Sequence, residues 1–279
     1  MFGGQSLASK HALKIIESMR QNIFLLFIAV FLLSCENNAT NNSSTEVEAP
    51  SAATLIQKAI DNHGGEVYKK VAIDFDFRDR HFHVEGIGGD FTYIRSFSDT
   101  TGTQFRDMLT NSAFSREING EKQQLTPKDS AAYANSVNSV VYFALLPYFL
   151  QDAAVQSSYL GEVTIKGEPY HKIKVTFQQD GGGKDFDDEY IYWLHKDKNT
   201  MDYLAYNYQV DGGGARFREA YNVRTIEGIR FADYINYKPT TGTLDVVTFD
   251  DLFAQGKMEE LSRIDTENVK VELEKMADN

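Results

Sequence analysis

The sequence predicts an α+β domain of the antiparallel type, with an N-terminal helix and a buried helical insert among many strands. Three observations support this fold class. Apolar residues first recur at helical spacing, and they then alternate with a period of two through most of the remaining chain. The stretch 136–151, SVNSVVYFALLPYFLQ, is apolar almost all round. A helix of that kind is buried, or closes over something buried.

The N-terminal helix is predicted from apolar residues spaced three and four apart over residues 53–60, and Gly64-Gly65 ends it. His63 is then the last helical residue. It is either a ligand or general base, or a histidine that completes the C-terminal turn, where its partial charge suits the helix dipole. We favour the second interpretation.

Strand-like alternation begins at Ile73. Ile73 and Phe75 lie on one face, whereas Phe82 and Val84 fall in the other phase, which predicts a bulge or sharp bend near residues 78–81. Further strands are predicted at about 90–97, 103–109, 113–118, 159–166, 169–177, 187–195, 201–209, 216–224, 230–238 and 243–250. The tail, 257–275, fits a last strand or a charged helix.

Helical composition begins near Pro127, between the two sets of strands. We expect residues 137–150 to pack as a plug against the concave face of the sheet. Two later segments, QQDGGGKDFDDEY and QVDGGGARFREAY, echo each other at an offset of 31 residues. Three glycines permit positive φ, so the echo predicts two similar long hairpin loops on one edge of the sheet.

This order of elements resembles the LolA/LolB lipoprotein-carrier fold. The resemblance implies an unclosed antiparallel β-barrel, or half-barrel, whose helices plug a hydrophobic hollow. The segments LIQKAIDNHGG, FDFRDRHF, NSVNSVVYFALLPY and DGGGARFREAYN resemble a Bacteroidota lipoprotein family of unknown function, over most of residues 52–250. That second resemblance implies no established activity, and a fold does not dictate a function.

The only cysteine, Cys35, follows an apolar run of eleven residues, 23–33. A spanning helix needs about 20 apolar residues, so this run has the length of a signal-peptide core instead. Leu32-Leu33-Ser34-Cys35 resembles the bacterial lipobox. That resemblance implies that residues 1–34 are removed and that Cys35 is acylated.

Two alternatives to lipidation remain, a secretory signal with an incidental cysteine and a short membrane anchor. Met19 is an alternative start. Residues 35–51 have the composition of a flexible tether, and residues 52–279 are predicted to form a single β-rich domain. The expected location is the cell envelope, where Cys35 would anchor the protein to the outer membrane on its periplasmic or surface face.

The net charge is −12, and it would be −14 without residues 1–34, which hold three Lys/Arg and one Glu. Such acidity argues against nucleic acid as a partner and against broad docking on anionic lipid. The sequence contains no G-x-S-x-G, H-E-x-x-H or P-loop pattern. No cofactor is predicted.

The first candidate site is the segment Arg78, Asp79, Arg80, His81 and His83. His81 and His83 share a face of a strand and could ligate a metal, but no third ligand is signalled. We favour a bent strand that carries surface charges.

The second candidate is the acidic loop Asp180, Asp185, Asp187, Asp188 and Glu189, in which Asp180, Asp185 and Asp187 are the calcium candidates. Clustered carboxylates beside glycines suit Ca²⁺, although the spacing matches no known calcium loop, and a solvated loop is favoured.

The third candidate is the face of one strand that carries Arg216, Arg218 and Arg224. Cross-strand ion pairs with Asp187 and Glu189 explain this face, and we favour them. The sharper interpretation is a guanidinium fork that grips a carboxylate or phosphate head group.

The leading functional hypothesis is a non-enzymatic envelope lipoprotein that binds or carries a hydrophobic or amphiphilic ligand against aromatic side chains. Its candidate ligand-binding residues are Arg78, Arg80, His81, Trp193, Tyr206, Arg216 and Arg218. The alternative is an envelope hydrolase that uses Asp79, His81 or His63. A third hypothesis is a scaffold lipoprotein with no small ligand.

Overall fold

A computed structural model describes residues 49–178, 188–209 and 212–273. The predicted signal segment 1–34, the predicted acylation site Cys35 and the predicted tether up to residue 48 lie outside the described residues. So do the calcium candidates Asp180, Asp185 and Asp187.

Helix α2, Ala52–His63, confirms the predicted N-terminal helix, and its buried face contains Leu55, Ile56, Ala59 and Ile60. The helix ends at Gly64, where the backbone φ is 137°, a value that residues other than glycine rarely adopt. An added Cβ at Gly64 would also lie 3.0 Å from Ile229 Cγ1. A short 3₁₀ helix, η1 (Gly65–Lys70), then leads into the first strand.

The first sheet has the strand order β14-β1-β2-β3-β4-β5-β6, with antiparallel neighbours. Its strands are β1 (Val71–Phe77), β2 (Arg80–Glu85), β3 (Thr92–Ser98), β4 (Gln104–Thr110), β5 (Phe114–Ile118), β6 (Glu121–Lys122) and β14 (Thr266–Leu273). The strands expected at 90–97, 103–109 and 113–118 are therefore present, within a few residues at each end.

Of the two alternatives predicted near residues 78–81, the bulge is wrong and the sharp bend is present, as a hairpin turn. Residues Arg78 and Asp79 form a two-residue turn between β1 and β2, with Arg78 at a φ of 57°. Because the turn reverses the chain, Phe82 lies opposite Phe75 on the same face, and their rings stack 5.1 Å apart. The change of phase in the apolar alternation is therefore caused by a hairpin between two strands, and not by one strand that switches faces.

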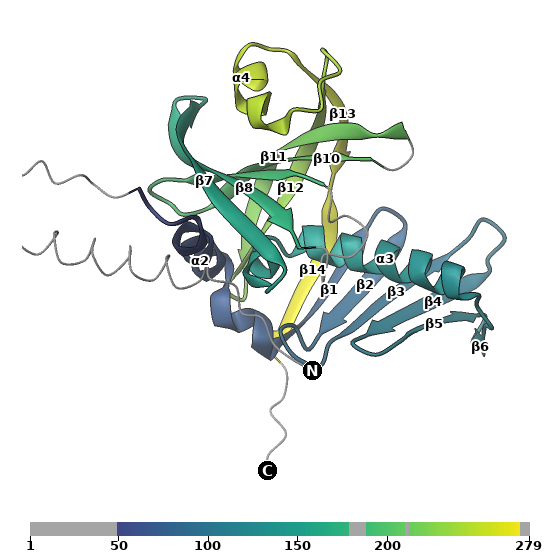
Figure 1. Cartoon of the computed structure of the whole chain (residues 1–279). Helices are drawn as coiled ribbons and strands as arrows, with labels where there is room; N and C mark the ends of the chain where they lie inside the picture. Colours follow the sequence, from purple (N-terminus) through teal and green to yellow (C-terminus); the bar gives the residue numbers. More distant parts are fainter. Residues whose placement is uncertain (1–48, 179–187, 210–211, 274–279) are drawn as a thin grey trace, which may run out of the picture. The chain divides into compact units, whose positions relative to one another are not determined.

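The helical insert is α3, Pro127–Ala144, followed by the 3₁₀ helix η2, Tyr148–Gln151. Thr126 caps α3, and its hydroxyl accepts a hydrogen bond from Asp129 N at 3.1 Å. The helix lies along β3, β4 and β5 of the first sheet (Figure 1). Val137 and Val141 are fully buried there, as expected for a plug. The insert is not buried on every side, however, because Asn138 and Ser139 are exposed.

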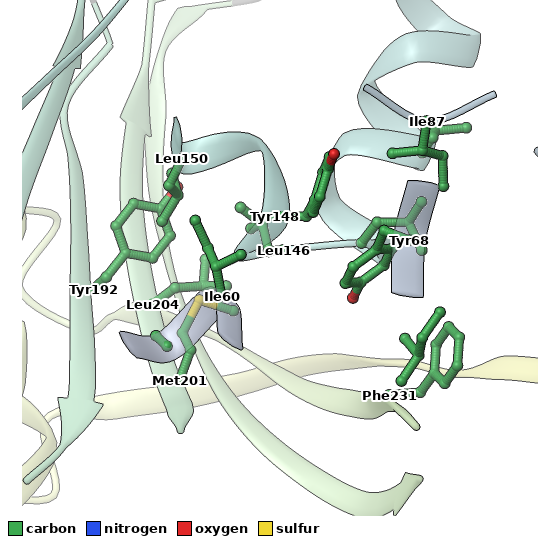
Figure 2. Packing of buried hydrophobic residues seen from close by; sticks show 14 of the residues in the cluster. Ile60, Tyr68, Ile87, Leu146, Tyr148, Leu150, Tyr192, Met201, Leu204 and Phe231 are labelled. Atoms are coloured by element: carbon green, nitrogen blue, oxygen red, sulfur yellow. The ribbon is translucent and has the colours of Figure 1, made fainter. Parts of the chain in front are cut away.

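The second sheet is an antiparallel meander with the order β13-β12-β11-β10-β9-β8-β7. Its strands are β7 (Val155–Ile165), β8 (Glu168–Phe177), β9 (Tyr190–His195), β10 (Met201–Tyr208), β11 (Gly214–Ile226), β12 (Ile229–Pro239) and β13 (Met258–Ile264). Helix α2 packs on one face of this sheet, and Figure 2 shows Ile60 among buried side chains that include Tyr192 and Leu204.

The strand predicted at 243–250 is wrong. Residues Val246–Thr248 form the 3₁₀ helix η4, and Phe249–Ala254 form helix α4. The Asp245 carboxylate accepts from Val247 N at 3.3 Å and caps the turn. Val246 and Phe249 are then buried against the outer face of the second sheet, in a separate cluster with Trp193 and Phe217.

The tail resolves into two strands that belong to different sheets. Strand β13 closes the second sheet, one residue (Asp265) follows, and β14 joins the first sheet beside β1. Asp233 fastens this corner, because its carboxylate accepts from Thr266 N at 2.9 Å and pairs with Arg224 Nη1 at 3.1 Å. At the far ends, β6 and β7 do not pair within the described part of the chain. The fold is therefore an unclosed half-barrel of the α+β class, as expected.

Candidate functional site

Two cavities flank helix α3 between the sheets, and Ser139 and Phe143 contribute to both. Phe143 packs on Tyr206 of the second sheet at 5.4 Å between ring centroids, while Val137 and Val141 face the first sheet's core. The helix thus separates what would otherwise be one hollow, as a plug does.

The first cavity has a volume of about 370 Å³, and we call it the arginine cavity. Its apolar wall comes from β1, α3, β12 and β13, and it consists of Phe75, Phe77, Val140, Phe143, Ala144, Ala232 and Ile264. Three guanidinium groups line the same space, those of Arg78, Arg216 and Arg218. Tyr206 also lines it, so four of the seven predicted ligand-binding residues meet here.

Arg218 is held between aromatic rings. Its guanidinium carbon lies 4.6 Å from the ring centroid of Phe143 and 5.2 Å from that of Tyr206. Its Nη2 donates to Tyr206 Oη at 2.9 Å, while its Nε is buried without a partner in the described residues. A buried donor without an acceptor is rare in proteins, so this nitrogen needs an explanation.

Arg216 lies one step nearer the strand end, opposite Tyr206 in the register of β10 and β11. Its guanidinium stacks 5.2 Å from the ring of Tyr208, and its Nη1 donates to Ala215 O at 2.8 Å. Arg78, in the β1–β2 turn, lies 5.0 Å from the ring of Phe77. In each case an aromatic ring covers one face of the cation.

The ion pairs expected for Arg216 and Arg218 are not found among the described residues. Glu189 pairs with Lys174 instead, and Asp187 lies outside the described residues. Both arginines point to the inner side of the sheet, together with Tyr206. Arg224, by contrast, does form an ion pair, with Asp233.

The strands that flank the two Asp-Gly-Gly-Gly segments end at the same end of the second sheet. These strand ends are Phe177 and Tyr190 for the first segment, and Tyr208 and Gly214 for the second. The first segment lies outside the described residues. Because Arg216 follows Gly214 closely, the arginine cavity opens near this end.

The second cavity has a volume of about 550 Å³, and we call it the tyrosine cavity. It lies on the other side of α3 and is lined by Tyr93, Tyr142, Tyr148, Tyr190, Phe91, Phe149 and Phe177, with Asn135, Asn138 and Gln151. The Tyr142 hydroxyl is buried without a hydrogen-bond partner in the described chain. Burial raises the pKa of Asp152, which also lines this cavity.

A buried ion cluster lies beneath α3 that the sequence analysis missed. Asp107, fully buried, accepts from Arg116 Nε at 2.6 Å and from Arg95 Nη2 at 2.6 Å. Arg95 Nη1 also donates to Ser136 of α3 at 2.8 Å, and Arg116 lies 3.6 Å from the ring centroid of Tyr133. The only available signal was the alternation of each strand, which places Arg95 and Tyr93 on one face.

The residues of the first candidate segment, 78–83, do not form one site. His81 is exposed on the outer face of the first sheet, where Asp74 lies 3.1 Å from its Nε2 and Asp76 lies 2.7 Å from its Nδ1. His83 shares Asp74 at 3.0 Å, so the two histidines do lie on one face. Arg80 lies 4.6 Å from the ring of Phe97 and lines neither cavity.

His63 forms no site with Asp79 or His81, because α2 buries it and both ring nitrogens are engaged. Nδ1 donates to Ala59 O at 2.7 Å, and Nε2 accepts from Arg230 Nη1 at 3.1 Å. Burial, reinforced by the charge of Arg230, lowers the pKa of His63 to about 3. His63 thus completes the helix end as expected, but as a neutral ring, so the expected charge–dipole interaction is wrong.

Trp193 is also misplaced by the sequence interpretation. It is buried on the outer face of the second sheet, 5.4 Å from Phe217 and beneath η4 and α4. Of the predicted ligand-binding residues, Arg80, His81 and Trp193 therefore lie outside both cavities.

No group of three His, Cys, Asp or Glu residues is placed to hold a metal ion within residues 49–178, 188–209 and 212–273. None of the helices described in those ranges is long and apolar enough to cross a membrane.

Comparison with known proteins gives a family match and several similar folds. Residues 21–266 match DUF6503, a family of unknown function. No curated protein matches the sequence. A LolA superfamily protein from Nitrosomonas europaea has a TM-score of 0.47 at 13% identity, covering 82% of this chain and 96% of that one.

Two further solved structures are similar at the same level. A DUF1329 family protein from Desulfovibrio piger has a TM-score of 0.46 at 11% identity, covering 80% of this chain and 93% of that one. A putative outer membrane lipoprotein-sorting protein domain from Vibrio parahaemolyticus has a TM-score of 0.44 at 8% identity, covering 79% and 92%.

Proposed function

Because the chain belongs to the DUF6503 family, whose function is unknown, we propose a function from its geometry: non-enzymatic binding or carriage of a hydrophobic or amphiphilic molecule in the cell envelope. The arginine cavity is the observation that carries this proposal. Its volume of about 370 Å³ falls in the range of small-molecule sites, which are concave, mostly apolar and equipped with a few polar groups.

The position of α3 supports the same function. The helix meets the first sheet through buried Val137 and Val141, but it meets the second sheet through aromatic contacts beside the cavities. An apolar chain that enters on either side of α3 gains contact with rings already turned inward. Burial of apolar surface contributes about 25 cal/mol per Å², so each part of a tail that contacts these rings adds to binding.

The test is a lipid-binding assay on a variant whose cavity is filled. Ala144 lines the arginine cavity, so Ala144→Trp should exclude a neutral fluorescent amphiphile, N-phenyl-1-naphthylamine, and raise its dissociation constant about tenfold or more. Ala131→Trp, on an exposed turn of the same helix, is the matched control and should bind like the original chain. No probe binding to the original chain would contradict the proposal and would favour a scaffold without a small ligand.

Membrane attachment through acylated Cys35 is part of the proposal, together with removal of residues 1–34, a tether over 35–51 and a single domain over 52–279. The support is the apolar run that ends at the only cysteine and its likeness to a lipobox. Cys35→Ser should leave an uncleaved or soluble precursor and abolish labelling by a fatty-acid probe. Labelling that persists in this variant would contradict lipidation.

A further inference from the structure

We infer that the molecule bound in the arginine cavity carries an anionic head group, a phosphate or a carboxylate, gripped by Arg216 and Arg218. This inference rests on the proposed binding function and names the chemical class of its ligand. It is carried by the way arginines are paired across the described chain.

Every described arginine outside this cavity has a carboxylate within 4 Å. The pairs are Arg80–Asp79, Arg95–Asp107, Arg106–Glu117, Arg116–Asp107, Arg224–Asp233, Arg230–Asp202 and Arg263–Glu260. The three arginines of the described chain without such a partner are Arg78, Arg216 and Arg218, and all three line the arginine cavity. The full chain has 40 acidic and 28 basic residues, yet among the described residues no carboxylate pairs with the arginines of this one place.

The lining of the cavity extends this observation. None of the described residues that line it is Asp or Glu, and its polar groups are hydroxyls and an amide, such as Ser139, Thr266 and Asn236. Three like charges around one small apolar space repel one another, and the low polarity of the walls strengthens the repulsion. A bound anion reverses the sign of this interaction, so the site is arranged for one.

The geometry of each guanidinium leaves its hydrogen-bonding edge for the ligand. A guanidinium donates in its own plane, while aromatic rings contact its face. The Arg218 guanidinium carbon lies 4.6 Å from the ring centroid of Phe143, its Nη2 donates to Tyr206 Oη, and the Arg216 guanidinium carbon lies 5.2 Å from the ring centroid of Tyr208. Arg218 still has a buried Nε without an acceptor in the described residues, so the rings orient the cation without satisfying it.

The same geometry orders the two ends of the ligand. Arg216 lies nearer the strand end, beside Gly214, and Arg218 lies two residues deeper, opposite Leu204. The apolar wall of Phe75, Val140 and Ala232 continues past them toward the core. An amphiphile therefore binds with its tail inward along α3 and its head at the arginines.

The experiment compares two probes of equal chain length, decyl phosphate and decanol, by titration against the full chain. We expect decyl phosphate to bind about tenfold or more tightly than decanol, as a charge-assisted bond provides. Arg216→Gln and Arg218→Gln should each remove most of this preference and leave the decanol constant within about twofold. Arg218→Lys, which keeps the charge but not the fork, should lose only part of it.

The matched control is Arg263→Gln. Arg263 belongs to β13 between two residues that line the cavity, Ser262 and Ile264, but it is itself exposed and paired with Glu260. Arg263→Gln removes the same charge close to the cavity, but from a side chain that does not line it. This variant should therefore leave both dissociation constants unchanged. Equal loss of the preference in this control would mean that the arginines act through net charge, which would overturn the inference.

Three outcomes separate this inference from the function on which it rests. Equal binding of decanol and decyl phosphate would overturn the head-group site and leave the carrier function standing. Binding of neither probe would overturn both. Inorganic phosphate that binds as tightly as decyl phosphate would overturn the amphiphile and identify a site for a free anion. A melting temperature for each variant, measured by circular dichroism, shows that every comparison is made on folded protein.

Discussion

Two arginine clusters face helix α3, one from each sheet, and they are built in opposite ways. On the first sheet, Arg95 and Arg116 converge on the buried carboxylate of Asp107. On the second sheet, Arg216 and Arg218 converge on a cavity, and rings rather than carboxylates surround them. A cation whose charge is matched within the protein holds a helix in place, whereas one matched only by rings is available for a ligand.

The first prediction tests helix α3, which both clusters contact. Val141→Asp should destabilise the domain by about 5 kcal/mol, because it places a carboxylate without a partner in a fully buried site. Urea denaturation measures the change. Asn138→Asp, on the exposed side of the same helix, is the control and should change stability by about 0.5 kcal/mol or less. A tolerated Val141→Asp would show that α3 is not part of the core.

The second prediction breaks the matched cluster. Asp107→Asn leaves Arg95 and Arg116 buried without their counter-charge, so we expect a loss of about 3–5 kcal/mol in the free energy of unfolding. Glu117→Gln removes an exposed carboxylate 3.9 Å from Arg106 on the neighbouring strands, and it should cost about 1 kcal/mol or less. Similar losses in the two variants would contradict the distinction between matched and surface charges.

The third prediction concerns the protonation of His63, the last residue of α2. Its ring accepts a hydrogen bond from a third arginine, Arg230. The folded-state pKa of about 3 lies below the ordinary value of 6.5, so the folded protein disfavours the charged ring. The contribution of neutral His63 to the free energy of unfolding should be fully present above about pH 6.5. It should fall as the pH drops toward 3, by about 3 kcal/mol at pH 4. Chemical denaturation at several pH values measures it. His63→Gln should lack this component between pH 6.5 and 4.5, and an unchanged slope would contradict it.

The smallest stability effect is expected in the unmatched cluster. Arg216→Gln and Arg218→Gln should each change the free energy of unfolding by about 1 kcal/mol or less, because each loses ring contacts but abandons no buried carboxylate. Arg224→Gln on the same strand is the comparison, and it should cost about 2–3 kcal/mol, since it leaves Asp233, at 5% exposure, without its counter-charge. Equal costs at the three positions would erase the difference between the clusters.

Periodicity in the sequence predicts most elements of this fold, because burial on one face marks α2, α3 and nearly every strand. It misplaces Phe82 because a two-residue turn and a bulge produce the same phase change, and only the pairing with Phe75 separates them. It misses α4 because Leu244, Val246 and Phe249 fit either a strand or a turn of helix. The wrong placement of Trp193 has the same cause, because the outer face of its sheet is buried only when α4 covers it.

Four of the seven candidate residues chosen from the sequence line the arginine cavity, but the sequence does not predict how they are arranged. Spacing alone places Arg216 and Arg218 on one face, and their neighbours in the sequence suggest carboxylate partners. Whether that face turns inward depends on how the strand packs against α3, and the sequence does not state it. The Arg95–Asp107–Arg116 cluster was hidden for the same reason, because its members lie on three strands and meet only through the register.

The single-residue step from β13 to β14 has a consequence for how the chain folds. Strand β1, the first strand in chain order, pairs with β14 at the opposite end of the described chain, where Val71 lies opposite Leu273. Pairings of such long sequence separation close large loops and slow folding. The first sheet therefore keeps an open edge at β1 until the second sheet is built and delivers the last strand. An open strand edge can pair with other chains, so premature aggregation would begin at that edge.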